Sequence, residues 1–379
     1  MKKTLFTALI CALLTLTACT PQAEVSSPAD TSSQTEQSQS VELLYAKEFA
    51  IERCSDNISL ITIGGSDRFV IADKGTEIPS EYGNSAVIYR PVENIYSAAS
   101  STMDFFNELG CLDNVAMTST KESDWSLDYM QELFGSGKIS YVGKYNAPDF
   151  EYIASANCGM VLESQMITHS PEIKEQLEAL GIPVLVERSS YEEHPLGRLE
   201  WIKLYGELLG KQELAERIFN EKNSMVTEIL TDERTEKTAA FFYISTSGSV
   251  NVRKPGDYIS KMIELAGGNY IFTSEDLSVD ENALSTMNIQ METFYAKAKD
   301  ADFLIYNGTI GELRTLDDLI AKDALFADFK AVREGNVWCS GKNMYQQITS
   351  TADVISDFHK IFTGKAGDGE ALTYLYRLK

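Results

Sequence analysis

The sequence predicts an α/β protein with two lobes, each built on a parallel-rich sheet, joined by a single long interlobe helix with a ligand cleft between the lobes. The chain has 379 residues, which is too long for one ordinary core and suits two lobes of roughly 150 residues each. β-prone and helical segments alternate on both sides of one long helical stretch, and such alternation is typical of parallel sheets. That stretch, residues 195–231, predicts a connecting helix around 50 Å long at about 1.5 Å per residue.

The first forty residues indicate export and a lipid anchor. A lysine pair precedes an apolar run, residues 5–16, that is too short to span a bilayer. The run leads into Leu-Thr-Ala-Cys ending at Cys19, which resembles the lipobox of bacterial lipoproteins. We therefore expect a signal peptide at 1–18 and lipidation of Cys19, with an ordinary secretory signal as the alternative. Residues 19–40 are rich in Ser, Gln and Thr and predict a flexible tether, because they can bury little apolar surface.

Residues 41–194 predict the N-terminal lobe. It opens on a β-hairpin, in which the β-prone runs 58–63 and 68–72 flank a Gly-Gly-Ser-Asp turn. Strand and helix patterns then alternate, and the last helix begins at a Ser-Pro pair of the kind that caps a helix N-terminus. The expected strands are 85–89, 95–98, 115–117, 160–163 and 184–186, and the expected helices are 102–109 and 172–180.

Residues 232–379 predict the C-terminal lobe, where the alternation repeats after the 195–231 helix. Gly267 and Gly268 end the first of its helices, as glycines at a helix C-terminus commonly do. The expected strands are 239–245, 303–306 and 336–339, and the expected helices are 258–266, 291–298, 316–329 and 350–362.

Composition excludes several classes of function. The formal net charge is −23 and no basic run offsets it, so we expect no nucleic-acid partner. The cysteines beyond the leader form no Cys-x-x-Cys pair, which disfavours a zinc site and leaves buried free thiols, or one disulfide, as the expectation. The chain contains no nucleophile elbow, P-loop or dinucleotide-binding glycine motif. We therefore predict a binding protein with no resident cofactor and no metal site of its own, rather than an enzyme.

The order and spacing of several segments resemble the class III periplasmic-binding-protein family, whose members bind ferric siderophores, haem and cobalamin. The resemblance covers roughly residues 41–362, and its last two segments, 265–269 and 326–337, are similar to the pattern of the family's second lobe. The segments that carry it are 91–113, 180–184, 192–201, 265–269 and 326–337. The resemblance implies two lobes, a rigid connecting helix, a cleft between the lobes and little hinge motion.

The resemblance also implies a function. It indicates a lipid-anchored extracytoplasmic receptor that delivers a metal chelate to the permease and ATPase subunits of an ABC importer. A ferric siderophore is the first expectation for the ligand, with cobalamin and haem as alternatives. A lipoprotein that presents its ligand to a sensor, instead of to an importer, is the alternative function.

Family members dock on their permease through one acidic residue on each lobe. The matching positions here are Glu151 and Glu292. Each opens a predicted helix, where a carboxylate also complements the helix dipole. A purely structural role at the helix terminus is therefore the alternative for both residues.

Ligands of open α/β sheets bind at the carboxyl ends of the strands, and this rule selects the candidate ligand-binding residues. Arg198 suits a carboxylate or phosphate on the ligand, with an ion pair to Glu193 or Glu200 as the alternative. Three histidines are too few for a bare metal receptor, although Tyr or Met could ligate haem. The full candidate set is Ser100, Ser101, Gln165, Tyr191, Arg198, Tyr243, Arg253 and Tyr345.

Overall fold

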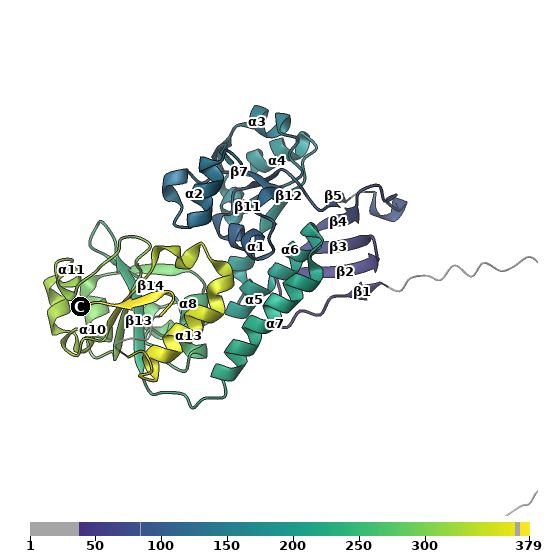
Figure 1. The fold of residues 1–379 in the computed structure, drawn as a ribbon. Coiled ribbons are helices and arrows are strands. Elements are labelled where there is room, and N and C mark those ends of the chain that lie inside the picture. Colours follow the sequence, from purple (N-terminus) through teal and green to yellow (C-terminus); the bar gives the residue numbers. More distant parts are fainter. Residues whose placement is uncertain (1–37, 84, 368–371) are drawn as a thin grey trace, which may run out of the picture. The chain divides into compact units, whose positions relative to one another are not determined.

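The computed structural model describes residues 38–83, 85–367 and 372–379. The expected signal peptide, the lipidation site Cys19 and nearly all of the tether lie outside these residues. The described residues belong to one compact unit, in which an N-terminal sheet, two lobes and a group of connecting helices are distinguishable (Figure 1). Within this part of the chain, no helix has both the length and the apolar character needed to cross a membrane.

The N-terminal sheet has five strands in sequence order. Its first four strands are antiparallel and its last pairs in parallel with the fourth. The expected hairpin is confirmed, because β3 and β4 pair directly and Gly64 and Gly65 take left-handed φ values of 56° and 74° in the turn. The strands are β1 (Gln39–Ser40), β2 (Phe49–Ser55), β3 (Ile58–Ile63), β4 (Asp67–Asp73) and β5 (Ala86–Arg90).

The first lobe has a fully parallel sheet with the strand order β12-β11-β6-β7-β8. The five strands expected from residue 85 onward are confirmed within a residue or two, the first of them being β5 of the N-terminal sheet; the short strand β8 and the helix α2 were not expected. The elements are β6 (Ile95–Ser97), α1 (Met103–Glu108), β7 (Val115–Thr118), α2 (Asp128–Gly135), β8 (Ser140–Tyr141), α3 (Phe150–Ser155), β11 (Val161–Ser164), α4 (Pro171–Ala179) and β12 (Val184–Glu187). Because the sheet is parallel, the carboxyl ends of its strands share one edge. A small hairpin, β9 (Gly143–Lys144) and β10 (Ala147–Pro148), precedes α3.

The expected single helix over residues 195–231 is instead three helices, α5 (Pro195–Glu200), α6 (Ile202–Leu209) and α7 (Gln212–Ile229). The main break is at Gly210, which ends α6 in the left-handed conformation with φ of 66°. Beyond it, α7 runs beside α6 (Figure 1). The two helices approach so closely that a Cβ atom on Gly206 would lie 2.7 Å from the Cβ of Ala215. The apolar periodicity of the sequence continues past Gly210, so it gave no sign of the turn. The turn is set by the left-handed conformation of Gly210.

Gly210→Ala is expected to lower the free energy of unfolding by about 1 kcal/mol, because a Cβ atom is strained in the left-handed region. Gly135→Ala is the matched control. Gly135 ends α2 without a positive φ, and a Cβ atom there would meet nothing within 4 Å. Urea denaturation of both variants checks the prediction, and equal effects of the two substitutions would contradict it.

The second lobe has a mixed sheet with the strand order β16-β14-β13-β17-β18-β19, and β15 pairs with β13. β13, β15, β17 and β18 are mutually parallel, and antiparallel strands lie at both edges. The strands are β13 (Thr238–Ile244), β14 (Val250–Arg253), β15 (Asn269–Tyr270), β16 (Thr286–Ile289), β17 (Phe303–Tyr306), β18 (Val337–Ser340) and β19 (Leu375–Arg377).

The helices of the second lobe follow the expected pattern with one correction. The helix expected over residues 316–329 ends at Ile320, and a 3-10 turn begins at Ala324. The reason is local, since the side chain of Asp323 accepts a bond from the Leu325 amide at 2.9 Å and so starts a new turn. The helices are α8 (Tyr258–Leu265), α9 (Ser274–Leu277), α10 (Met291–Ala298), α11 (Leu316–Ile320), α12 (Lys330–Arg333) and α13 (Thr351–Phe362).

Buried carboxylates of the connecting helices form hydrogen bonds and ion pairs with the N-terminal region. Glu207 of α6 accepts bonds from Arg53 Nε at 2.6 Å and Arg90 Nη1 at 3.0 Å. Glu200 of α5 accepts three consecutive backbone N–H groups, those of residues 44–46, at 2.8–2.9 Å. A buried carboxylate is stable only when it is paired in this way, so the N-terminal sheet and the connecting helices form one structural block.

Direct hydrogen bonds also link the two lobes. The buried carboxylate of Asp104 in α1 accepts bonds from the backbone N–H, at 2.8 Å, and the hydroxyl of Thr349. The side chain of Gln346 accepts from the Ser126 amide at 2.8 Å and donates to the Asp124 carbonyl at 2.9 Å. Separating the lobes would break these hydrogen bonds, and their loss opposes a wide hinge opening.

Candidate functional site

A cleft with a volume of about 530 Å³ lies between the two lobes. This volume is in the range of small-molecule sites, about 300–1,000 Å³. The first lobe contributes the residues that follow β11 and β12, at the carboxyl edge of its sheet, which is where open α/β sheets bind ligands. The second lobe contributes the end of β14, the start of α8 and the loop before β16. The lining residues are Ser164, Gln165, Met166, Ser190, Tyr191, Arg253, Asp257, Tyr258, Leu284 and Ser285.

Three of the candidate ligand-binding residues line this cleft. Gln165 opens the 3-10 turn after β11, where the Ser164 hydroxyl accepts a bond from the Met166 amide at 3.3 Å. Tyr191 ends the turn after β12, and 43% of its surface is exposed. Arg253 is the last residue of β14, and its Nη1 lies 3.5 Å from Asp257 Oδ2. The rule that ligands bind where strands end therefore located residues of both lobes.

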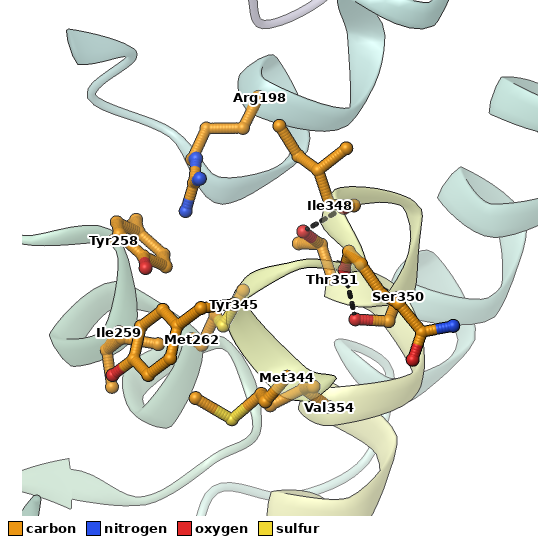
Figure 2. A pocket seen from close by; sticks show the side chains of 11 residues that line it. Arg198, Tyr258, Ile259, Met262, Met344, Tyr345, Ile348, Ser350, Thr351 and Val354 are labelled. Carbon is orange, nitrogen blue, oxygen red and sulfur yellow. Dashed lines mark hydrogen bonds between the residues drawn. The ribbon is translucent and has the colours of Figure 1, made fainter. Parts of the chain in front are cut away.

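Arg198 and Tyr345 lie around a smaller cavity next to the cleft. Figure 2 shows the Arg198 side chain directed toward Tyr258, whose ring centre is 3.6 Å from the guanidinium carbon. The ring of Tyr258 borders both the smaller cavity and the cleft. The hydroxyl of Tyr345 accepts a bond from Arg253. The remaining lining residues are Ile259, Met262, Met344, Gln347, Ile348, Ser350, Thr351 and Val354.

Ser100, Ser101 and Tyr243 line neither of these two cavities. Ser100 and Ser101 form the half-buried turn that leads from β6 into α1. That helix carries Asp104, so this part of the sheet edge is occupied by the bond to Thr349 of the second lobe. Tyr243 is a half-buried residue of β13 that packs on the core of the second lobe.

Arg253 at the cleft and Arg198 at the adjoining smaller cavity give this region a positive charge. Arg198 is only 8% exposed, and among the described residues its guanidinium has no hydrogen-bond or ion-pair partner. The alternative pairs do not form, because Glu193 bonds Lys47 and Glu200 bonds the N-terminal backbone. Two guanidinium groups therefore face one carboxylate, that of Asp257. Burial raises the pKa of Asp257, against the lowering effect of Arg253.

Asp257 and Tyr258 are the site residues that sequence reasoning missed. Asp257 caps α8, since its side chain accepts a bond from the Ile259 amide at 3.0 Å, and the cap places Tyr258 in the first turn facing both arginines. A capping residue that follows a strand and precedes a helix is visible in the sequence.

The candidate docking residues are exposed on different lobes. Glu151 is in the first turn of α3, and Glu292 is in the first turn of α10. Neither caps its helix, since Asp149 caps α3 and α10 has no side-chain cap. In the part of the chain that the structure describes, neither carboxylate has a hydrogen-bond or ion-pair partner, so both can meet another protein.

The three histidines lie away from the base of the cleft. His194 stacks on Tyr45 with ring centres 4.3 Å apart and accepts a bond from the Leu196 amide, so it caps α5. His359 lies 3.0 Å from Asp232, and His169 is exposed at the end of the turn after β11. Across residues 38–83, 85–367 and 372–379, no group of three or more His, Cys, Asp or Glu side chains is arranged to hold a metal ion. The four described cysteines are unpaired.

The chain is similar to a known protein family and to two uncharacterised lipoproteins. A family model described as periplasmic binding protein matches residues 95–343. Two uncharacterised lipoproteins of Methanocaldococcus jannaschii are 24% and 22% identical to the chain, covering 97% and 88% of it and 95% and 86% of their own lengths. Both alignments extend well beyond the residues of the family model.

Solved structures share the fold. A periplasmic binding protein of Veillonella parvula has a TM-score of 0.60 at 18% identity and covers 80% of this chain and 97% of its own. The haem-binding protein HutB of Vibrio cholerae scores 0.58 at 15% identity, covering 73% and 99%. The petrobactin-binding protein YclQ of Bacillus subtilis scores 0.56 at 14% identity, covering 74% and 95%.

Proposed function

Because the chain belongs to the periplasmic binding protein family, we propose that it is the substrate-binding lipoprotein of an ABC importer and captures an anionic metal chelate, with a ferric siderophore as the first candidate. The family supplies the general role of solute binding. The residues around the cleft indicate the charge of the ligand. The relatives named as lipoproteins support a lipid anchor at Cys19.

The observation that carries the proposal is the buried arginine pair beside the cleft. A guanidinium without a partner is costly to bury, and Arg198 is held in that state by Tyr258 on one side and the connecting helix on the other. Anionic oxygen atoms of a carboxylate, catecholate or hydroxamate would relieve the cost with charge-assisted hydrogen bonds. The protein is strongly acidic as a whole, so this local positive charge is specific to the site.

Haem is the second candidate, and two exposed side chains at the cleft favour it. Met166 is 50% exposed and Tyr191 43% exposed, and both line the cleft. Thioether and phenolate groups are established axial ligands of haem iron. Haem also carries carboxylates that would suit the arginine pair.

Delivery to a permease is the remaining part of the proposal. Lipidation of Cys19 would hold the receptor beside its transporter at high effective concentration. Glu151 and Glu292 would then dock the two lobes on the permease, with charge pairs setting the register. A ligand-presenting sensor lipoprotein would share the anchor and the cleft but would not need both docking residues.

The proposed function is tested with the chain purified without its leader. Ferric catecholate, hydroxamate and citrate complexes, haemin and cyanocobalamin are titrated while tryptophan fluorescence and the visible spectrum are recorded. Saturable binding of a ferric complex supports the first candidate, and a shift of the Soret band supports haem. Binding of cyanocobalamin alone, or of none of these compounds, would contradict the proposal.

Arg198→Gln is expected to weaken binding of the anionic chelate roughly 10- to 150-fold, since one charge-assisted bond contributes roughly 1.5–3 kcal/mol. Arg198→Lys keeps the charge but loses the planar fork, so its affinity should be intermediate. Arg217→Gln, which removes an exposed arginine of α7, is the control and should bind normally. Equal affinities of wild type and Arg198→Gln would remove Arg198 from the site.

A further inference from the structure

A second cavity of about 310 Å³ lies between the N-terminal sheet and the first lobe. One wall is the β3–β4 turn, and the opposite wall is the segment that runs from β11 into α4. This turn precedes residue 95, where the family match begins. We call this cavity the side chamber, and its lining residues are Ile63, Gly64, Ser66, Asp67, Gln165, Ile167, Thr168, Pro171, Lys174, Val186 and Arg188.

The side chamber adjoins the interlobe cleft. Gln165 lines both cavities. Arg188, in the chamber wall, lies with its guanidinium carbon 5.1 Å from the ring centre of Tyr191, which lines the cleft. The side chain of Gln165, in the turn after β11, and the Arg188–Tyr191 pair, after β12, therefore stand between the cleft and the side chamber.

The N-terminal sheet holds this dividing wall in place. Arg188 Nε lies 2.5 Å from Glu48 Oε2, just before β2. Its side chain packs against Gly64, where an added Cβ atom would lie 3.1 Å from Arg188 Nε. The left-handed φ of Gly64 and this close approach both require glycine at the position. The N-terminal sheet therefore forms one wall of the side chamber. Through Arg188, it also positions the ring of Tyr191.

The chemistry of the side chamber differs from that of the arginine pair. Both of its cations are already paired, Arg188 with Glu48 and Lys174 with Glu178 at 2.6 Å. Hydroxyl and amide groups of Ser66, Thr168 and Gln165 surround an apolar surface. The apolar side chains are Ile63, Ile167 and Val186. The exposed carboxylate of Asp67 completes the lining. Such a lining suits an uncharged arm with an apolar body and amide or hydroxyl groups that can donate hydrogen bonds, rather than an anionic end.

We propose that the ligand site has two chambers, in which the cleft holds the anionic chelating core and the side chamber receives an uncharged, amide- or hydroxyl-bearing arm of the same ligand. The proposal rests on the proposed function, since it assumes a chelate in the cleft. It narrows the ligand class to elongated chelates and assigns the N-terminal sheet a part in selecting them.

The proposal is tested with two substitutions that reduce the volume of the side chamber, one on each of its opposite walls. Ser66→Trp and Thr168→Trp each place a large side chain at an exposed position that lines the chamber, so neither should impair folding. Ser80→Trp is the control, because Ser80 is also exposed on the N-terminal region but lines neither the chamber nor the cleft. The probes are matched by chelating group. Iron(III) tris(acetohydroxamate) and iron(III) tris(catecholate) are compact, whereas ferric N-acetyldesferrioxamine B, whose free arm is uncharged, and ferric enterobactin carry amide-bearing chains.

Both chamber variants are expected to bind the chain-bearing complexes about tenfold more weakly than wild type, with binding of the compact complexes and of all probes to Ser80→Trp unchanged. Equal loss for compact and chain-bearing complexes, or no loss for either, would overturn the side chamber while leaving the proposed function intact. Failure of wild type to bind any of the four iron complexes would overturn the siderophore function, and the side chamber with it.

Discussion

Glu163→Gln is expected to raise the free energy of unfolding by about 3 kcal/mol at pH 7 and to leave it unchanged at pH 4. Glu163 lies in β11 and is 0% exposed, and neither carboxyl oxygen has a hydrogen-bond partner among the described residues. The neighbouring phenol of Tyr96 is also buried and unpartnered. Burial raises the pKa of Glu163 to about 8, so the folded protein keeps this carboxyl protonated at neutral pH.

The sign of the effect follows from proton linkage. In the unfolded chain the carboxyl group has a pKa of 4.5, whereas the folded value is about 8. Between these values unfolding releases a proton, so stability falls by about 1.4 kcal/mol per pH unit as the pH rises. Below pH 4.5 both states are protonated and the stability is fully present. Glutamine cannot ionise, so the variant escapes the loss, and its advantage over wild type is largest above pH 8.

Urea unfolding followed by circular dichroism at pH 4, 5.5, 7 and 8.5 measures this effect. Glu175→Gln, at an exposed position of α4, is the control and should change stability by less than about 0.5 kcal/mol at any pH. A difference between Glu163→Gln and wild type that does not grow with pH would show that Glu163 is ionised in the folded protein.

Local sequence patterns predicted most of the fold because parallel strands buried on both faces leave short, continuous apolar runs. Strand β17 and the first three residues of β12 appear in the sequence as such runs. Strands near a sheet edge are harder to recognise. The edge strand β16 and its neighbour β14 carry polar residues such as Asn288 and Asn251. The prediction of a single connecting helix was wrong for a different reason. Its apolar periodicity continues through Gly210, and only the packing of α7 on α6 decides that the chain turns back.

The candidate site was predictable to the extent that strand ends define it. Gln165, Tyr191 and Arg253 follow strands and line the cleft. Ser100 and Ser101 also follow a strand, but the bond between α1 and Thr349 closes that part of the edge. Contacts between residues more than two hundred positions apart, such as this one, set which strand ends remain open. No local pattern carries that information, and the same holds for the side chamber, whose walls come from separate parts of the chain.

Reversing the charge at both docking positions, Glu151→Arg with Glu292→Arg, is expected to reduce uptake of the ligand to background while leaving ligand affinity unchanged. Each glutamate is exposed in the first turn of a helix, one on each lobe. A permease that meets these carboxylates with arginines would face like charges at both ends of the complex, and such juxtaposition costs several kcal/mol. Neither glutamate lines the cleft or the smaller cavity beside it, so chelate binding should not respond.

Radioactive iron uptake by cells that express the variant receptor measures the effect, with purified protein titrated in parallel. Glu172→Arg with Glu275→Arg is the matched control, because these residues are also exposed glutamates in the first turn of a helix, one on each lobe. The control loses the same two favourable dipole interactions, about 0.3–1 kcal/mol each, and the same net charge. Any deficit confined to the Glu151 and Glu292 pair therefore reports docking rather than helix stability, and normal uptake by that pair would exclude both residues from the permease interface.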